Sequence, residues 1–130
     1  MIEKVNPSHP DKVADRIAGA LVDLAYKRQE NPKIAVEVLI GHGTATVIIE
    51  SSVIFSERDV AEIIERITSR DDFRINLVSK EQDRYLANNQ NGTPRCGDNG
   101  IFKGVPLTTE EKQLSEIAKK IYDMYPTDGK

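Results

Sequence analysis

Cysteine is nearly absent from this sequence, which has 130 residues and a single cysteine, Cys96. One cysteine excludes an internal disulfide and leaves no pair with the spacing of a metal site. An excess of charge of one sign is also lacking, because 18 basic residues face 21 acidic ones and the formal net charge is -3. Since there is no basic stripe with interleaved aromatic residues either, we expect no nucleic-acid partner.

Long apolar runs are absent as well. No stretch approaches the roughly 20 apolar residues that a helix needs to cross a bilayer, and no signal peptide precedes the first polar residues. We therefore expect no membrane partner and a cytoplasmic location. The chain is long enough for one ordinary domain with a hydrophobic core, so residues 1–130 are predicted to form a single α+β domain or the N-terminal fragment of a larger protein.

The first helix is predicted to follow the run Asn6-Pro7-Ser8-His9-Pro10-Asp11-Lys12. Ser8 with Asp11 approximates a capping box, and Pro10 suits the first turn of a helix, where its missing N–H costs nothing. Asn31-Pro32 ends the element. The apolar residues recur at three- and four-residue spacing, the mark of one buried stripe, and they are Val13, Ala14, Ile17, Leu21, Leu24 and Ala25.

Two further helices are predicted by the same criteria. Ser56 with Asp59 forms the expected N-cap of the second helix, which Asp71-Asp72 breaks, and Thr108 or Thr109 caps the third. Their stripes are Val60, Ile63, Ile64 and Ile67 in the second helix, and Leu114, Ile117, Ala118, Ile121 and Tyr122 in the third.

Residues 34–40 and 44–50 alternate apolar and mixed positions and predict a β-hairpin. A two-residue turn at His42-Gly43 gives one wholly apolar face and places Glu37 and Glu50 together on the other, whereas a three-residue loop would mix both faces. The turn predicts that Val36 faces Ile49, Val38 faces Val47 and Ile40 faces Ala45, and that Leu39, Thr46 and Ile48 share the mixed face with the two glutamates.

A third strand is predicted at residues 73–78, and residues 1–5 are a candidate edge strand. Residues 81–107 lack periodicity, which is typical of a long functional loop of the kind found at active sites. The resulting fold is α+β, with an antiparallel or mixed sheet covered on one face by helices, in the order (β)αββαβ-loop-α. The mixed face carries Glu37 and Glu50 as apparently interior carboxylates that need a cation or a donor, and such a face usually meets a partner subunit.

The run from Ser8 to Lys12 resembles the Gly-His-Pro-Asp-Lys signature of the S-adenosylmethionine synthetases (methionine adenosyltransferases). The continuation Val13-Ala14-Asp15-Arg16-Ile17 is similar too. Three more matches follow in order: Ala35-Val36-Glu37 resembles that family's Ala-Cys-Glu strand, Ile49-Glu50-Ser51-Ser52 its Gly-Glu-Ile-Thr segment, and Gly97-Asp98-Asn99-Gly100-Ile101-Phe102 its Gly-Asp-Gln-Gly-Leu-Met-Phe. The matches cover essentially the whole chain but only the N-terminal third of a family member.

The resemblance implies a transferase that joins ATP and L-methionine. In that family the methionine sulfur displaces triphosphate from the ribose 5′ carbon, and the triphosphate is then hydrolysed to phosphate and pyrophosphate. By the same resemblance, His9 would stabilise the leaving triphosphate oxygen as the catalytic residue, with Lys12 as a further phosphate contact. Asp11 and Asp98 would hold Mg²⁺.

The remaining implied roles concern the second substrate and a second cation. Glu37 matches a K⁺-site residue, while Glu50 and Gln82 match methionine-binding positions. The family pairs its mixed sheet faces in a homodimer whose active sites lie between subunits, so the resemblance implies the same assembly here.

The residue types suit this chemistry without reference to the family. A thioether sulfur has no proton to lose, so no general base is needed, and the barrier lies in the charge that develops on the leaving oxygens. Hard cations and a histidine stabilise that charge, and magnesium takes one or two carboxylates plus phosphate oxygens. Asp98 lies between Gly97 and Gly100, where backbone can approach a phosphate closely.

Simpler interpretations of the same residues stay open. Asp11 suits a helix cap, His9 an exposed cap neighbour, and the segment 97–100 an ordinary turn. Two alternative functions follow from them: a non-catalytic nucleotide-binding homologue, and a structural dimerisation module that uses only the hairpin face.

The sequence also departs from the family pattern. Pro7 stands where an acidic residue is usual, Ser8 replaces the glycine, Asn99 replaces glutamine, and residues 83–95 do not match the family's loop. The chain ends at Lys130, before the family's triphosphate-binding lysines and arginines. We therefore expect the chain alone to be inactive.

Overall fold

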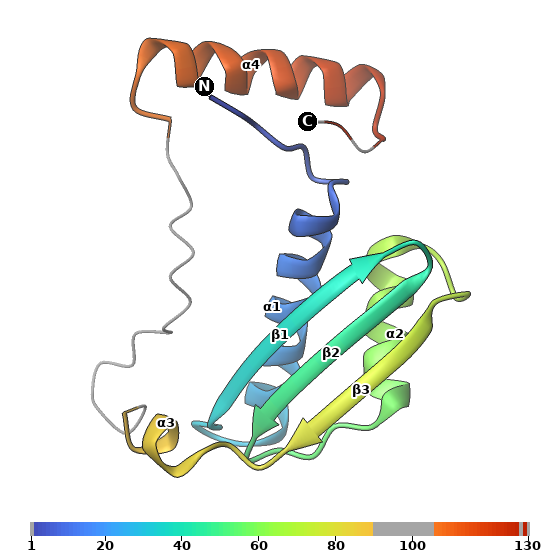
Figure 1. The fold of residues 1–130 in the computed structure, drawn as a ribbon, viewed down its shortest axis with the longest axis vertical. Coiled ribbons are helices and arrows are strands. Elements are labelled where there is room, and N and C mark those ends of the chain that lie inside the picture. Colours follow the sequence, from blue (N-terminus) through green and yellow to red (C-terminus); the bar gives the residue numbers. More distant parts are fainter. Residues whose placement is uncertain (1, 90–105, 128, 130) are drawn as a thin grey trace.

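The computed structural model describes residues 2–89, 106–127 and 129. Within these ranges the chain forms a small sheet with two helices packed on it and a separate helix near the C-terminus (Figure 1). The elements are α1 (Pro10–Arg28), β1 (Ile34–Gly41), β2 (Thr44–Ser51), α2 (Glu57–Thr68), β3 (Arg74–Lys80), α3 (Arg84–Asn89) and α4 (Thr109–Met124).

The sheet is mixed, with strand order β1-β2-β3. β1 and β2 form the antiparallel hairpin, whereas β3 pairs with β2 in parallel. The parallel pairing arises because α2 carries the chain back along the sheet before β3 begins, as in a βαβ unit. The predicted α+β class is confirmed, and of the two predicted sheet types the mixed one is correct.

The hairpin register agrees with the prediction residue by residue. Val36 pairs with Ile49, Val38 with Val47 and Ile40 with Ala45. The turn residues His42 and Gly43 both have positive φ, 47° and 71°, which is the backbone of a two-residue turn whose twist matches that of the strands. Glu37 and Glu50 therefore share the outer face of the sheet.

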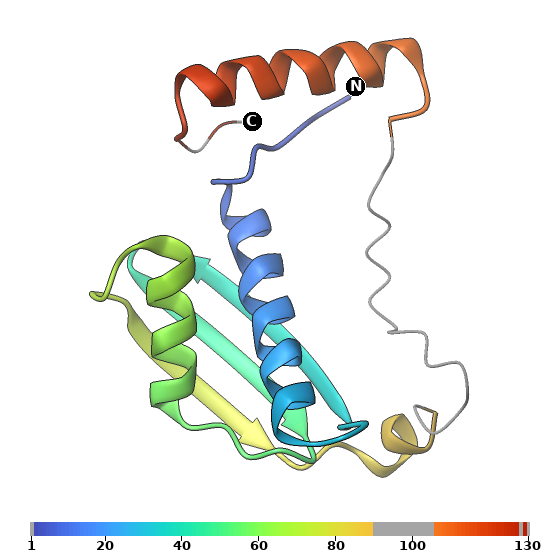
Figure 2. The same ribbon diagram turned by 180° about the vertical axis from the view of Figure 1, so that it is seen from behind.

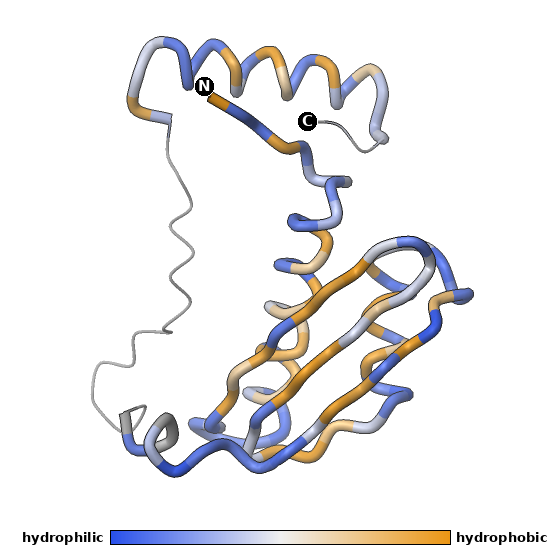
Figure 3. The backbone as a smooth tube through the Cα atoms, in the orientation of Figure 1, coloured by the Kyte–Doolittle hydropathy of each residue, from blue (hydrophilic) through white to orange (hydrophobic). Residues whose placement is uncertain are grey.

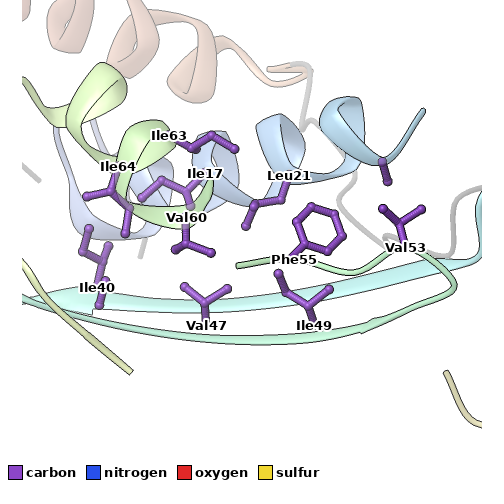
Figure 4. Packing of buried hydrophobic residues seen from close by; sticks show 12 residues of the cluster. Ile17, Leu21, Ile40, Val47, Ile49, Val53, Phe55, Val60, Ile63 and Ile64 are labelled. Atoms are coloured by element: carbon purple, nitrogen blue, oxygen red, sulfur yellow. The ribbon is translucent and has the colours of Figure 1, made fainter. Parts of the chain in front are cut away.

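The hydrophobic core lies between the inner face of the sheet and the helices α1 and α2, which cover that face (Figures 2 and 4). Figure 3 shows the apolar residues alternating along the strands and recurring along the helices. The predicted apolar stripes of α1 and α2 supply much of this core. The buried apolar residues are Ile17, Leu21, Ala25, Ile40, Ala45, Val47, Ile49, Val53, Phe55, Val60, Ile63 and Ile64.

The helix caps follow the predictions with one correction. Ser56 with Asp59 forms a complete capping box for α2, and Thr108 is the N-cap of α4. In α1, however, the N-cap is His9 and not Ser8. Ser8 lies one residue before the cap, in a turn in which its N–H donates to Asn6 Oδ1 (3.0 Å), and the His9 side chain accepts the Asp11 N–H in its place.

Three further expectations differ from the structure. Residues 2–5 form no strand, because Asn6 directs the segment toward the C-terminal tail, where its N–H donates to the carbonyl of Gly129. α3 lies inside the segment 81–107, for which a long loop is predicted, whereas residues 90–105 of that segment lie outside the described residues. The apolar stripe of α4 contributes no buried residue, since α4 lies apart from the sheet beside the N-terminal segment (Figure 1).

Candidate functional site

The predicted catalytic histidine lies at the N-terminus of α1. The Nδ1 atom of His9 accepts a hydrogen bond from the backbone N–H of Asp11 (3.3 Å) and lies 3.7 Å from an Asp11 carboxylate oxygen. The backbone carbonyl of His9 accepts from the N–H groups of Lys12 and Val13, which starts the helix. The His9 side chain is 20% exposed and that of Asp11 80%. The helix therefore holds the imidazole firmly and presents the carboxylate to solvent.

This hydrogen bond selects one tautomer of the neutral His9 ring. A ring nitrogen that accepts a hydrogen bond carries no proton, so the proton of neutral His9 lies on Nε2. Nε2–H is then available as a donor, beside a helix N-terminus whose dipole already favours anions. The arrangement can donate a hydrogen bond to an oxygen on which negative charge develops.

Asp11 and Lys12 point in different directions from the same turn. Lys12 Nζ lies 3.5 Å from an Asp15 carboxylate oxygen, so its charge is directed along the helix and not toward His9. The exposed Asp11 carboxylate is the oxygen type that a hard divalent cation prefers. Asp11 therefore fits a magnesium ligand, whereas Lys12 would have to leave Asp15 to contact a phosphate.

The second predicted magnesium ligand, Asp98, lies outside the described residues, as do its flanking glycines and Cys96. Within the residues that the structure describes, no group of three or more histidine, cysteine, aspartate or glutamate side chains could hold a metal ion. A magnesium ion that also binds phosphate oxygens needs only one or two protein carboxylates, so Asp11 alone is compatible with such a site.

Glu37 and Glu50 lie diagonally across β1 and β2 on the outer face of the sheet. Glu37 pairs with Ile48, and Glu50 with Ala35 on one side and Lys80 on the other. The expectation that both carboxylates are interior is wrong for this chain: Glu37 is exposed and Glu50 is half-buried. The reason is that both helices cover the opposite face.

The nearest neighbours of Glu37 on the outer face are apolar. Its cross-strand neighbour is Ile48, and its own strand places Ala35 and Leu39 beside it on the same face. Two oxygen-bearing side chains of β2, those of Thr46 and Glu50, lie diagonally from Glu37 on this face. The potassium site at Glu37 stays a prediction.

Gln82 follows the end of β3 and is buried, with 6% of its surface exposed. It lines a small cavity at the end of the sheet where β1 starts and where β2 and β3 finish. Glu50 lies near the same end of the sheet. The two predicted methionine-binding residues are therefore at one end of the sheet.

His9 and Asp11 lie at the other end. α1 begins toward the end of the sheet that carries the hairpin turn, and it ends near the start of β1 (Figures 1 and 2). Its 19 residues span about 28 Å at 1.5 Å per residue. The structure thus separates the predicted phosphate residues from the predicted methionine residues by roughly the length of a helix.

A cavity that sequence reasoning missed lies between α1, β1, the N-terminal segment and α4. Its volume is about 1090 Å³. No sequence signal could have revealed it, because its shape depends on where α4 lies. Charged residues of both signs line this cavity. The basic ones are Lys4, Lys12, Arg16 and Lys119, and the acidic ones are Asp15, Asp23 and Glu37.

In the comparison with protein families, residues 1–85 match the N-terminal domain of S-adenosylmethionine synthetase. The S-adenosylmethionine synthase of Helicobacter pylori strain Shi470 is 28% identical over 116 residues, which cover 78% of this chain. That of Mycoplasma capricolum is 30% identical and matches 89% of this chain. The chain spans 30% and 33% of the length of these two relatives.

Among solved structures, an unusual S-adenosylmethionine synthetase from Campylobacter jejuni superposes with a TM-score of 0.55 at 22% identity. The match covers 61% of this chain and 25% of that protein, and it supports the fold. In the described ranges of the chain, no helix is long and apolar enough to span a bilayer.

Proposed function

Because this chain belongs to the S-adenosylmethionine synthetase family, whose N-terminal domain covers residues 1–85, we propose that it is the N-terminal part of a methionine adenosyltransferase. In the proposed reaction the sulfur of L-methionine forms a bond to the ribose 5′ carbon of ATP while the bond from that carbon to the triphosphate oxygen breaks. Water then hydrolyses the triphosphate to phosphate and pyrophosphate. The product is S-adenosylmethionine.

The observation that carries this proposal is the geometry at the start of α1. His9 accepts the Asp11 N–H through Nδ1, which leaves Nε2–H to donate to the leaving triphosphate oxygen. The dipole of α1 adds to the attraction for phosphate, although the N–H groups of its first turn, those of Asp11, Lys12 and Val13, already donate to His9. Magnesium, when bound by Asp11 and the proposed ligand Asp98, would neutralise charge on the phosphate oxygens.

We further propose that the complete site forms between two copies of the chain. The outer sheet face exposes Leu39, Ile48 and Val78, which are 76%, 43% and 43% exposed. If two such faces pack across a two-fold axis with their strands antiparallel, the His9 end of one chain lies over the Gln82 end of its partner. A homodimer of this kind would join the two halves that are separate within one chain.

The test is S-adenosylmethionine formation from ATP and methionine with Mg²⁺ and K⁺, measured by mass spectrometry on the full-length protein that contains this chain. Asp11→Asn and His9→Ala are expected to lower turnover at least tenfold, because each removes one stabilising contact to the charge of the transition state. Asp23→Asn, also on α1 but two turns or more away, is the matched control. Absence of product from the unaltered protein would refute the proposal. The chain of 130 residues alone is expected to be inactive.

Two alternatives have their own support. The replacement of the usual acid by Pro7 favours a non-catalytic homologue, which would bind Mg-ATP without making S-adenosylmethionine. The exposed apolar outer face favours a structural dimerisation module, for which Asp11→Asn combined with Asp98→Asn would leave every measured property unchanged.

A further inference from the structure

Asn6 is one of three buried polar residues in the described ranges, with 8% of its surface exposed. Toward the turn that follows, its Oδ1 accepts the N–H of Ser8 (3.0 Å) and its carbonyl accepts the N–H of His9 (3.1 Å). Toward the C-terminal tail, its Nδ2 donates to the carbonyl of Thr127 (2.6 Å) and its N–H to that of Gly129 (3.1 Å). Asn6 therefore joins the start of α1 to the tail that follows α4.

Both ends of the Asn6 side chain are used, and this requires an amide. The amide carries an acceptor and a donor on one carbon, one for Ser8 and one for Thr127. A carboxylate of the same shape would keep the acceptor but would bring a second acceptor against the Thr127 carbonyl. The tail also packs closely on this amide, since a Cβ added at Gly129 would lie 3.0 Å from Nδ2.

The turn that Asn6 begins contains two candidate caps for α1. His9 is the observed cap, and its Nδ1 accepts the Asp11 N–H. Ser8 is a competitor, because a hydroxyl three residues before Asp11 can accept the same N–H in a capping box. A helix capped by Ser8 would take the Asp11 N–H away from the His9 ring.

The tail supports this turn from outside. A segment near a chain end frays unless other contacts tie it down, and residues 2–5 belong to no strand. The ties come from a part of the chain 121 positions away, where the tail after α4 returns to Asn6. Figure 1 shows α4 beside the N-terminal segment, which brings the tail to this place.

We propose that Asn6 is a positioning residue for His9. By closing the turn against the C-terminal tail, it keeps His9, and not Ser8, at the cap of α1, so that Nδ1 stays paired and Nε2–H stays available as the donor. The inference rests on the proposed function, in which Nε2–H donates to the leaving triphosphate oxygen. It adds a residue to which that function gives no role, and it makes the geometry of His9 depend on the tail.

The first experiment measures the imidazole ¹⁵N chemical shifts of the ¹⁵N-labelled chain in buffer alkaline enough that free histidine is neutral. The His9 signals should report the single tautomer that has its proton on Nε2. Asn6→Ala should give a mixture of tautomers and move the backbone N–H signal of Asp11, because that N–H can then leave the ring. His42 is the second of the two histidines in the sequence and serves as the internal reference.

Two variants make this test specific. Asn6→Asp keeps the acceptor for Ser8 and loses only the donor to Thr127, so it should change the His9 signals as well. Ser8→Ala is the control, because it keeps the backbone N–H that donates to Asn6 and should leave the His9 signals unchanged. Circular dichroism confirms that each variant is folded. Unchanged His9 and Asp11 signals in Asn6→Ala would overturn the inference, and unchanged signals in Asn6→Asp would overturn the part assigned to the tail.

Kinetics on the full-length protein separates positioning from a general structural role. Asn6→Ala should lower kcat about tenfold and leave the KM for methionine unchanged, because the contact to the leaving oxygen strengthens in the transition state. In a His9→Ala background the same substitution should lower kcat less than about twofold, since the group that it positions is gone. Equal factors in the two backgrounds would overturn the inference.

The two proposals fail in different ways. If the unaltered full-length protein forms no S-adenosylmethionine, the proposed function is refuted. The ring signals of His9 in the chain of 130 residues still decide whether Asn6 positions the imidazole.

Discussion

Asp59 joins the two core helices, and its removal is the most informative test of the fold. One carboxylate oxygen accepts from the Ser56 N–H and from the Ser56 hydroxyl, both at 2.8 Å, which completes the capping box of α2. The same carboxylate forms a two-bond ion pair with the guanidinium of Arg28 in the last turn of α1. That guanidinium also lies 5.7 Å from the centre of the Phe55 ring.

The expected loss follows from these contacts. Removing an N-terminal capping interaction costs about 1 kcal/mol. A hydrogen-bonded charge pair contributes about 1.5–3 kcal/mol, but the Arg28 side chain is 36% exposed and solvent screens the pair, so we use the lower end. Asp59→Ala should therefore lower the free energy of unfolding by about 2–3 kcal/mol.

Urea denaturation followed by circular dichroism measures this loss. Glu62→Ala is the matched control, because Glu62 also forms an ion pair, here with Arg58 on the same helix, α2. The side chains of Glu62 and Arg58 are much more exposed, at 62% and 87%. Such a pair is worth about 0.3–0.5 kcal/mol. If Asp59→Ala costs no more than Glu62→Ala, the contact between α1 and α2 does not contribute as the structure indicates. A double-mutant cycle with Arg28→Ala isolates the pair itself.

The pH dependence has a definite sign. The hydrogen bond from Arg28, followed by those from Ser56, holds the pKa of Asp59 well below its usual range. A carboxyl whose folded pKa is depressed contributes stability that is present above its unfolded pKa, about 3.9, and is lost as the pH falls below it. The difference in unfolding free energy between the unaltered chain and Asp59→Asn should thus be constant near pH 7 and shrink below about pH 4. A difference that grows on acidification would contradict this assignment.

Three further predictions address the core, the turn and the outer face. Ile49→Ala should lower the free energy of unfolding by about 2–5 kcal/mol in the same urea assay, because the side chain is fully buried; a loss below 1 kcal/mol would contradict the packing. Gly43→Ala should cost about 1 kcal/mol because φ is 71° there, whereas Gly41→Ala, with open space around the added Cβ, should cost much less; equal losses would contradict the turn. Leu39→Lys should shift the chain from dimer to monomer in sedimentation velocity, while Ile54→Lys, also exposed but on another surface, should not; a chain that sediments as a monomer before any substitution would refute the proposed dimer.

Sequence reasoning worked where neighbours along the chain decide the structure. A capping box joins residues three apart, so Ser56 and Asp59 were sufficient to place the start of α2. The hairpin register depends on one two-residue turn and on keeping one face apolar, and His42-Gly43 met both conditions. The same register placed Glu37 and Glu50 on one face.

It failed where distant parts of the chain decide. Ser8 is a residue type that caps helices, but its N–H donates to Asn6, and His9 takes the cap position. Asn6 is itself held by the distant C-terminal tail, because it donates to the carbonyls of Thr127 and Gly129. The burial of Glu37 was inferred from its apolar strand, yet which sheet face the helices cover is a matter of tertiary packing. The apolar stripe of α4 likewise predicts that one face of this helix packs against another surface, but it does not identify that surface as the sheet.

The sequence by itself therefore determined α1, α2, α4, the three strands and the pairing of the hairpin, because the local backbone and the period of the apolar residues settle these. It also supplied the helix start that we propose to bind phosphate. Only the tertiary structure decided that β3 runs parallel to β2, that α4 lies off the core, and that His9 and Gln82 lie at opposite ends of the domain. These depend on how chain segments far apart in sequence meet. The bonds between Asn6 and the C-terminal tail are of the same kind, since Asn6 and Thr127 lie 121 positions apart in the sequence.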